Sequence, residues 1–163
     1  MVNHMYYLNY FFIFSILGHL FECILIGKSG ILYGLWTPIY GIGAIIILML
    51  NKFIDKFKFK GFKKFISLFF ISSFCLSIIE AIGGYIIEFI FNKSMWDYTK
   101  LKFNIGKYTA IEMALIWGIG SLIFVYLLKP LIDKKINKTP KFITYFLVFL
   151  FIIDIFVTLI FKH

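Results

Sequence analysis

The sequence contains no arginine, although it has 17 basic residues and a formal net charge of +9. Such a charge is compatible with nucleic-acid binding. However, the basic residues are all lysines and stand almost entirely between long apolar runs. This placement is typical of the charges that set the orientation of a membrane protein. We therefore expect no nucleic-acid partner.

Charged residues of both signs are scarce. They make up 15% of the 163 residues, whereas about 25% is usual for a soluble domain. Hydrophobic residues make up 61%, so a water-soluble domain of ordinary composition is excluded. The composition predicts an all-α, polytopic transmembrane helix bundle in the lipid bilayer, with residues 1–163 forming a single integral membrane domain.

Cysteine is rare, and the common catalytic motifs are absent. The two cysteines lie inside apolar runs and are too few for a disulfide framework or a zinc motif. The sequence has neither a glycine-rich phosphate loop ending in Gly-Lys-Ser/Thr nor a Gly-x-Ser-x-Gly nucleophile elbow. We therefore predict no catalytic residue and no cofactor. If ATP energises transport, the ATPase must be a separate chain.

The apolar residues gather in five runs, each about 20 residues or longer and able to cross a bilayer as a helix. The predicted spans are approximately residues 6–27, 31–50, 65–91, 109–129 and 142–161. The second is the least regular, because it contains Pro38 between Gly34 and Gly41. A proline inside a helix frees backbone groups, which a neighbour or a cavity must then satisfy.

The lysines between the runs predict the orientation. Segments 51–64 and 129–141 carry 11 lysines on one side, and the other side carries 6. The positive-inside rule then places the N-terminus in the cytoplasm and the C-terminus outside. In 51–64, lysines alternate with phenylalanines. This is typical of a positively charged loop with aromatic anchors, of a segment in the membrane interface, or of a docking surface for a cytoplasmic partner.

Five small or polar residues of the third run lie four, three, four and four positions apart, so they share one helix face. They are Ser73, Ser77, Glu80, Gly84 and Glu88. A carboxylate near the bilayer centre costs at least ~2.5 kcal/mol, so this face should meet the bundle interior and not lipid. Other runs carry similar stripes: Ser15, Gly18, His19 and Glu22; Gly34, Thr37 and Gly41; and Thr109, Glu112 and Gly120.

The carboxylates of these stripes lie at related depths, in the outer half of the bilayer or, for Glu80, near its midplane. We predict that they line an outward-opening polar pocket shared by several helices. The lining carboxylates are Glu22, Glu80, Glu88 and Glu112. Alternatively, they are neutral carboxyl groups that donate hydrogen bonds between helices.

The segment 92–108 is the longest polar interruption on the predicted outer side. Trp96 and Tyr98 are typical of an aromatic belt at the membrane surface. Asn104 and Gly106 are typical of a turn. Because the segment joins two carboxylate-bearing spans, it is alternatively a lid over the pocket.

The lid interpretation predicts binding residues within the segment. They are Trp96, Asp97, Asn104 and Lys107. In this interpretation, Lys107 is an obvious neutralising partner for Asp97 or Glu112.

One pair of residues has the spacing of two metal ligands on a helix. His19 and Glu22 lie three positions apart, and a carboxylate from another span would have to complete such a site. A single histidine makes this pair a weak candidate, so the prediction is that no metal binds.

Several motifs occur in the order and spacing of a known family. They are Gly18 with Glu22; Gly34, Pro38, Ile39, Tyr40, Gly41 and Gly43; Glu80, Gly84, Tyr85 and Glu88; Trp96, Asp97 and Tyr98; Phe103, Asn104, Gly106 and Lys107; and Trp117 with Gly118. Over residues 10–130 approximately, the sequence resembles the bacterial family of ABC-transporter permeases of the CmpB type. The resemblance implies a permease-like subunit of the bacterial plasma membrane. It would act with a separate cytoplasmic ATPase or second membrane subunit, or as a homo-oligomer.

The sequence departs from the family pattern at four positions. The family usually has an aromatic residue, a proline, a second aromatic residue and an arginine at the positions of His19, Leu35, Met95 and Lys107. The last departure matters most, because lysine cannot make the bidentate contact of arginine with a carboxylate or phosphate. An anion-binding role based on such a contact is therefore in doubt.

Three functions follow from these patterns. The leading hypothesis is a membrane transport protein whose pocket binds a polar or cationic group through Glu80 and Glu88. The first alternative is a membrane-embedded enzyme acting on a lipid headgroup, with one carboxylate as general base and another as acid. The second is a scaffold or sensor whose polar stripes only hold the helices together.

Overall fold

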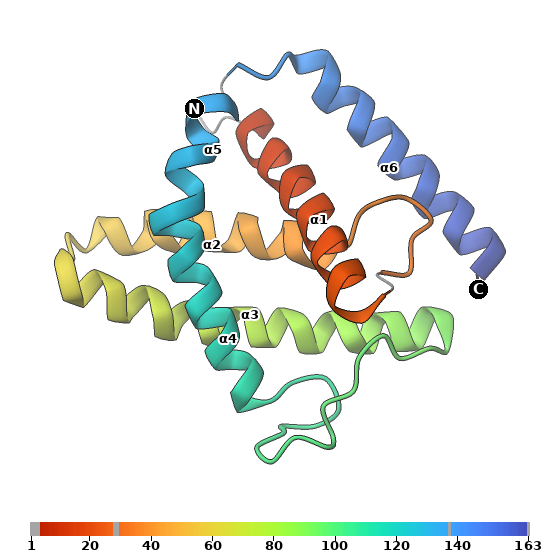
Figure 1. Ribbon diagram of the computed structural model, residues 1–163, viewed down its shortest axis with the longest axis horizontal. Coiled ribbons are helices and arrows are strands. Elements are labelled where there is room, and N and C mark those ends of the chain that lie inside the picture. The colour runs from red at the N-terminus through yellow and green to blue at the C-terminus, as the bar shows by residue number, and fades with distance from the viewer. Residues whose placement is uncertain (1–3, 28–29, 137, 163) are drawn as a thin grey trace.

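The computed structural model describes residues 4–27, 30–136 and 138–162, which fold almost entirely into helices. The helices are α1 (His4–Ile26), α2 (Pro38–Lys56), α3 (Gly61–Phe91), α4 (Ile111–Ile123), the π-helical segment η1 (Phe124–Leu128), α5 (Lys129–Ile136) and α6 (Lys141–Lys162). Because α4, η1 and α5 are continuous, five helices of the described residues are long and apolar enough to cross a membrane. The predicted all-α polytopic bundle is confirmed (Figure 1).

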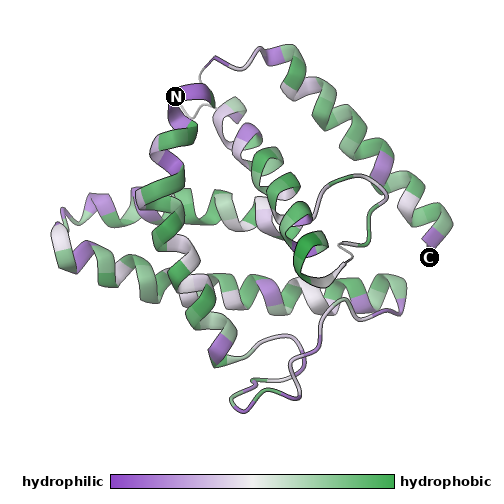
Figure 2. Ribbon diagram, viewed as in Figure 1, coloured by the Kyte–Doolittle hydropathy of each residue, from purple (hydrophilic) through white to green (hydrophobic). Residues whose placement is uncertain are grey.

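Helices α2 and α3 form a hairpin that α1 and α4 cross (Figure 1). Helix α1 packs on α2 and α4 packs on α3, whereas α6 lies at the edge of the bundle against α1. Apolar residues make up most of the long helices, whereas α5 and the α2–α3 turn are richer in polar residues (Figure 2). Exterior side chains such as Ile24, Phe89 and Phe161 are at least 72% exposed. Such a surface suits contact with acyl chains.

The buried apolar core lies where α1, α2, α3 and η1 meet. Its members include Tyr10, Leu48, Ile54, Leu68 and Phe124. All five are at most 4% exposed. This core lies nearer to the start of α1 and the end of α2. Toward the opposite ends of these two helices, the contacts are more polar.

Small residues let neighbouring helices approach closely. A Cβ atom on Gly18 of α1 would lie 2.3 Å from the Tyr40 ring of α2. A Cβ atom on Gly118 of α4 would lie 2.3 Å from the Ser73 hydroxyl of α3. Gly120 is an exception to the predicted stripe, because a Cβ atom there would meet nothing within 4 Å.

The second span differs from its predicted bounds of 31–50. Helix α2 begins at Pro38 and continues to Lys56. The residue before a proline disfavours the helical conformation, and Thr37 is accordingly extended, with Pro38 in the first turn. Residues 31–37 therefore form a non-helical segment beside the bundle.

Asp154 of α6 satisfies polar groups of this non-helical segment. Its carboxylate accepts hydrogen bonds from the Tyr33 amide at 3.0 Å, the Gly34 amide at 2.9 Å and the indole N–H of Trp36. In the structure it holds the segment before α2 against α6.

Two predicted loops are largely helical. The fourth span does not end at residue 129, because η1 and α5 extend it to Ile136. Asp133 stabilises this extension by accepting hydrogen bonds from the Tyr6 and Tyr10 hydroxyls of α1, both at 2.8 Å. In the segment 51–64, α2 and α3 continue from both sides and leave a turn of residues 57–60.

Candidate functional site

Glu80 is the buried carboxylate at the centre of the candidate site. It lies on α3 and is 4% exposed. Its Oε1 accepts a hydrogen bond of 2.8 Å from the Tyr98 hydroxyl, which comes from the loop between α3 and α4. Its Oε2 is buried and has no hydrogen-bond partner among the described residues. Glu80 thus has one well-formed hydrogen bond and one oxygen without a bond of good geometry in the described part of the chain.

Side chains from three further helices surround Glu80. Tyr40 of α2 lies within electrostatic reach of both Glu80 and Glu22 of α1. Trp117 of α4 lies beside Glu80, although its buried indole N–H makes no hydrogen bond of good geometry in the described structure. We call Glu22, Tyr40, Glu80, Tyr98 and Trp117 the Glu80 cluster. Its members come from α1, α2, α3, α4 and the loop between α3 and α4.

Tyr98 contacts this cluster from the loop between α3 and α4. Burial, followed by the nearby Glu80 carboxylate, raises the pKa of the Tyr98 hydroxyl above its ordinary value of 10.0. Tyr98 therefore keeps its proton at physiological pH and donates to Glu80. A buried carboxylate with one satisfied oxygen can be neutralised by a proton or by a cation, and either would take the second oxygen.

The loop of residues 92–110 is held over the cluster by Tyr108. This side chain is 1% exposed and packs on Gly84 of α3, where a Cβ atom would lie 2.4 Å from its ring. Trp96 donates a hydrogen bond of 3.4 Å to the Tyr108 carbonyl and meets the Tyr108 ring edge-on at 6.0 Å between centroids. The absence of a side chain at Gly84 thus lets the Tyr108 ring pack directly against α3.

Lys107 pairs with Glu88, not with Asp97 or Glu112 as predicted. The hydrogen bond to Glu88 raises the pKa of Lys107 above its ordinary value of 10.5, so the lysine remains charged at neutral pH. Lys107 also lies 5.0 Å from the centre of the Tyr108 ring. The prediction failed because the loop turns back toward the end of α3, and a linear sequence does not show that path.

Glu112 also holds the loop. Its Oε1 accepts a hydrogen bond of 3.1 Å from the backbone amide of Phe103. Because the amide comes from the loop and the carboxylate from the first turn of α4, this contact closes the far side of the loop. Glu112 is thus placed as a loop anchor in this structure.

Asp97 and Asn104 shape turns within the loop. Asp97 accepts hydrogen bonds from the Thr99 hydroxyl at 2.6 Å and the Thr99 amide at 2.8 Å, and these bonds lower the pKa of Asp97 below its ordinary value. The Asn104 amide donates to the Gly106 carbonyl at 3.2 Å, and Gly106 has the positive φ of 78° that favours glycine. Both side chains are exposed.

The structure thus divides the eight candidate residues into three groups. Glu22 and Glu80 belong to the interior cluster; Glu88, Glu112, Trp96 and Lys107 hold the loop; and Asp97 and Asn104 form turns. Sequence reasoning did not assign Tyr40, Tyr98, Trp117 or Tyr108 to the site. The first three stand in the motifs that carry the family resemblance, which was the available signal.

The weak metal candidates gain no further ligand. His19 is buried, and its Nδ1 has no hydrogen-bond partner in the described part of the chain. Among the described residues, no group of three histidine, cysteine or acidic side chains is placed to hold a metal ion.

The ion pair between Glu88 and Lys107 predicts a measurable effect on the loop. Lys107→Gln should speed proteolytic cleavage within residues 92–110 about two- to fivefold at low salt, since exposed ion pairs contribute little and are screened by salt. Glu88→Gln should have the same effect, and the double variant should be no worse than either. Lys93→Gln, which removes an exposed loop charge outside this pair, is the control. If the wild type and all four variants are cleaved at the same rate, the ion pair does not hold the loop.

Comparison with known proteins adds one match. A family model described as "Putative ABC-transporter type IV" matches residues 9–160. The match therefore includes α6, whereas sequence inspection limited the resemblance to residues up to about 130. No curated protein and no solved structure matches the chain.

Proposed function

The chain belongs to the family described as "Putative ABC-transporter type IV", and on this premise we propose that it is the permease-like membrane subunit of a transport complex. The five apolar helices give it the form of a polytopic membrane protein. We place ATP hydrolysis on a separate subunit, since residues 1–163 contain no phosphate-binding loop. The complex lies in the bacterial plasma membrane.

The proposed ligand site is the Glu80 cluster. The observation that carries this assignment is the buried Glu80 carboxylate, which has one oxygen on Tyr98 and the other without a partner among the described residues. Burying such a group inside a membrane protein is costly, and ionisable residues in that setting commonly mark ion or substrate pathways.

The cluster favours a polar or cationic ligand. Glu22 and Glu80 supply negative charge, while Tyr40, Tyr98 and Trp117 supply aromatic faces and hydrogen-bond donors. A cation gains from both carboxylate charge and aromatic faces. Lys107, the nearest candidate for an internal counter-ion on the loop, is already paired with Glu88 outside the cluster.

The loop of residues 92–110 is the proposed gate. Because Tyr98 occupies one Glu80 oxygen, a ligand that uses both oxygens must displace the Tyr98 hydroxyl. Three local contacts hold the loop. They are the ion pair of Lys107 with Glu88, the hydrogen bond from the Phe103 amide to Glu112 and the packing of Tyr108 on Gly84. The loop can therefore move without unpacking the apolar core, which lies toward the opposite helix ends. The lysine distribution supports a position of this gate on the outer face.

Co-purification tests the subunit assignment. The protein, tagged at its C-terminus and extracted from its native membrane in mild detergent, is expected to bring down an ATPase in stoichiometric amount. Charge reversal in the α2–α3 turn by Lys58→Glu and Lys60→Glu should reduce this recovery severalfold, since that turn is on the predicted cytoplasmic side. Lys100→Glu with Lys102→Glu makes the same charge change in the loop of the opposite side and should leave recovery unchanged. Recovery of the protein only as a homo-oligomer would contradict the subunit assignment.

A further inference from the structure

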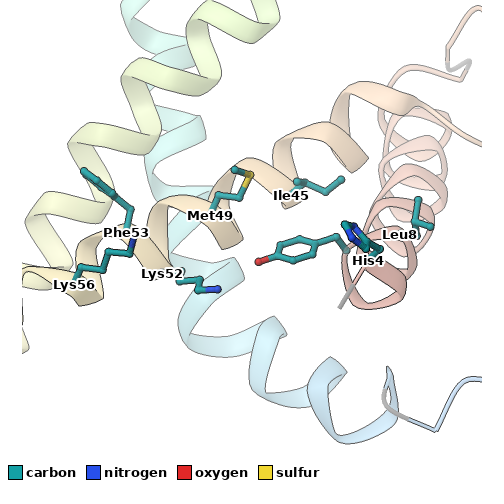
Figure 3. A pocket seen from close by; sticks show the side chains of 8 residues that line it. His4, Leu8, Ile45, Met49, Lys52, Phe53 and Lys56 are labelled. Carbon is teal, nitrogen blue, oxygen red and sulfur yellow. The ribbon is translucent and has the colours of Figure 1, made fainter. Parts of the chain in front are cut away.

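A groove of about 600 Å³ lies between the first half of α1 and the second half of α2, far from the Glu80 cluster along both helices. Its lining residues are His4, Tyr7, Leu8, Ile45, Met49, Lys52, Phe53 and Lys56. Figure 3 shows His4 and Leu8 on α1 facing Ile45, Met49 and Lys52 on α2. The proposed transport function assigns no role to this groove.

The groove changes from basic to apolar along its length. On α2, Lys56 and Lys52 lie near the helix end, and Met49 and Ile45 follow toward the middle of the span. The rise from Lys56 to Ile45 is about 16 Å, which is half of the hydrocarbon thickness. On α1, His4 lies at the helix start and Leu8 one turn further in. Both walls therefore run from a polar rim into the hydrocarbon region.

The basic side chains at the rim lack internal partners. Neither Lys52 nor Lys56 forms an ion pair in the described part of the chain, whereas Asp55, on the same stretch of α2, pairs with Lys64 at 2.6 Å. Lys52, Lys56 and His4 are also exposed. They are thus free to meet an anion from outside the protein.

We propose that this groove binds an anionic phospholipid of the surrounding bilayer, with the phosphate at Lys52 and Lys56 and an acyl chain on Leu8, Ile45 and Met49. The charge and the apolar floor match the two ends of such a molecule in the order in which a bilayer presents them. Lipid is also the one partner that always surrounds this face at high concentration. A soluble anion would use the rim but not the floor.

Native mass spectrometry of the full chain in a non-ionic detergent tests this proposal. The probes are phosphatidylglycerol and phosphatidylcholine with identical acyl chains. Phosphatidylglycerol should bind at one site about tenfold more tightly than phosphatidylcholine, because only the former carries a net negative charge. The K52Q/K56Q variant should lose this preference. The K134Q/K135Q variant removes two exposed lysines from α5 at the same end of the bundle and should keep it.

Three outcomes would overturn the proposal. Equal binding of the two lipids by the wild type would show that charge is not recognised. An equal loss in K52Q/K56Q and K134Q/K135Q would show attraction to net charge and not to the groove. Binding of glycerol 3-phosphate as tightly as the lipid, with no change in Met49→Gln, would show a site for a soluble anion. A tenfold weaker lipid signal in Met49→Gln, with glycerol 3-phosphate ineffective, would support the acyl-chain contact.

Discussion

Replacing Glu80 with glutamine is expected to abolish cation binding and transport while the protein still folds and inserts. Glutamine has nearly the same shape and keeps an oxygen that accepts the Tyr98 hydroxyl, so the contact with the loop survives. It lacks the negative charge that a cation requires. Loss of a buried charge that pairs with a ligand lowers affinity by about a hundredfold or more.

The measurement begins with ligand-induced thermal stabilisation in detergent. Wild-type protein is screened at fixed pH and ionic strength against alkali, divalent and organic ammonium cations. A cation that raises the unfolding midpoint of the wild type should have no effect on Glu80→Gln. The same cation is then followed in vesicles that contain the transport complex, where wild type should accumulate it and Glu80→Gln should not. Size-exclusion profiles that match between the two proteins confirm that folding is unchanged.

Glu88→Gln is the matched control for this experiment. Sequence analysis predicted that Glu88 contacts the ligand together with Glu80, but in the structure Glu88 pairs with Lys107 at the edge of the loop. The variant should therefore keep the affinity for the cation within about threefold, since an exposed ion pair contributes little. Normal binding and transport by Glu80→Gln would contradict the proposed site.

Replacing Gly84 with leucine is expected to be the most destabilising single change at the site. A Cβ atom would lie 2.4 Å from the buried Tyr108 ring, so even alanine forces the loop away from α3, and leucine adds three more carbon atoms. Overpacking of this kind costs about 1–3 kcal/mol or more. The unfolding midpoint should fall by several degrees, and residues 92–110 should become the first site of proteolysis. Gly84→Ala should show a smaller fall.

Gly120→Leu controls for the substitution itself. A Cβ atom at Gly120 meets nothing within 4 Å, and the residue is exposed on a helix covered by apolar side chains. Leucine there should leave the unfolding midpoint unchanged or raise it slightly, because leucine is a better helix former than glycine. If Gly84→Leu and Gly120→Leu have the same unfolding midpoint, the packing of Tyr108 on Gly84 is not what holds the loop.

The two substitutions separate transport from a scaffold role. If the polar stripes only hold helices together, Glu80→Gln should be mild in every assay and Gly84→Leu severe in all of them. If the Glu80 cluster binds a ligand, Glu80→Gln should lose function at full stability. The ratio of functional loss to stability loss at Glu80 therefore decides between the two hypotheses.

The five apolar helices, the interior polar faces and the interior position of Glu80 were predictable from the sequence. These features depend on local properties: the length of an apolar run and the 3.6-residue period of a helix. The contact of Gly18 with Tyr40 follows the same logic, since small residues on an interior face let a neighbour approach. Such features can be read without knowing which helices are adjacent.

Only the tertiary structure decided which groups are partners. The pairing of Lys107 with Glu88, the bond from Phe103 to Glu112 and the hold of Asp154 on the segment before α2 join residues whose distance depends on the path of a loop. Helix α5 likewise extends past the apolar run because Asp133 accepts hydrogen bonds from two tyrosine hydroxyls of α1. Hydrophobicity limits where a chain can cross a membrane, but a hydrogen bond or ion pair forms only where folding brings its two partners within about 3 Å.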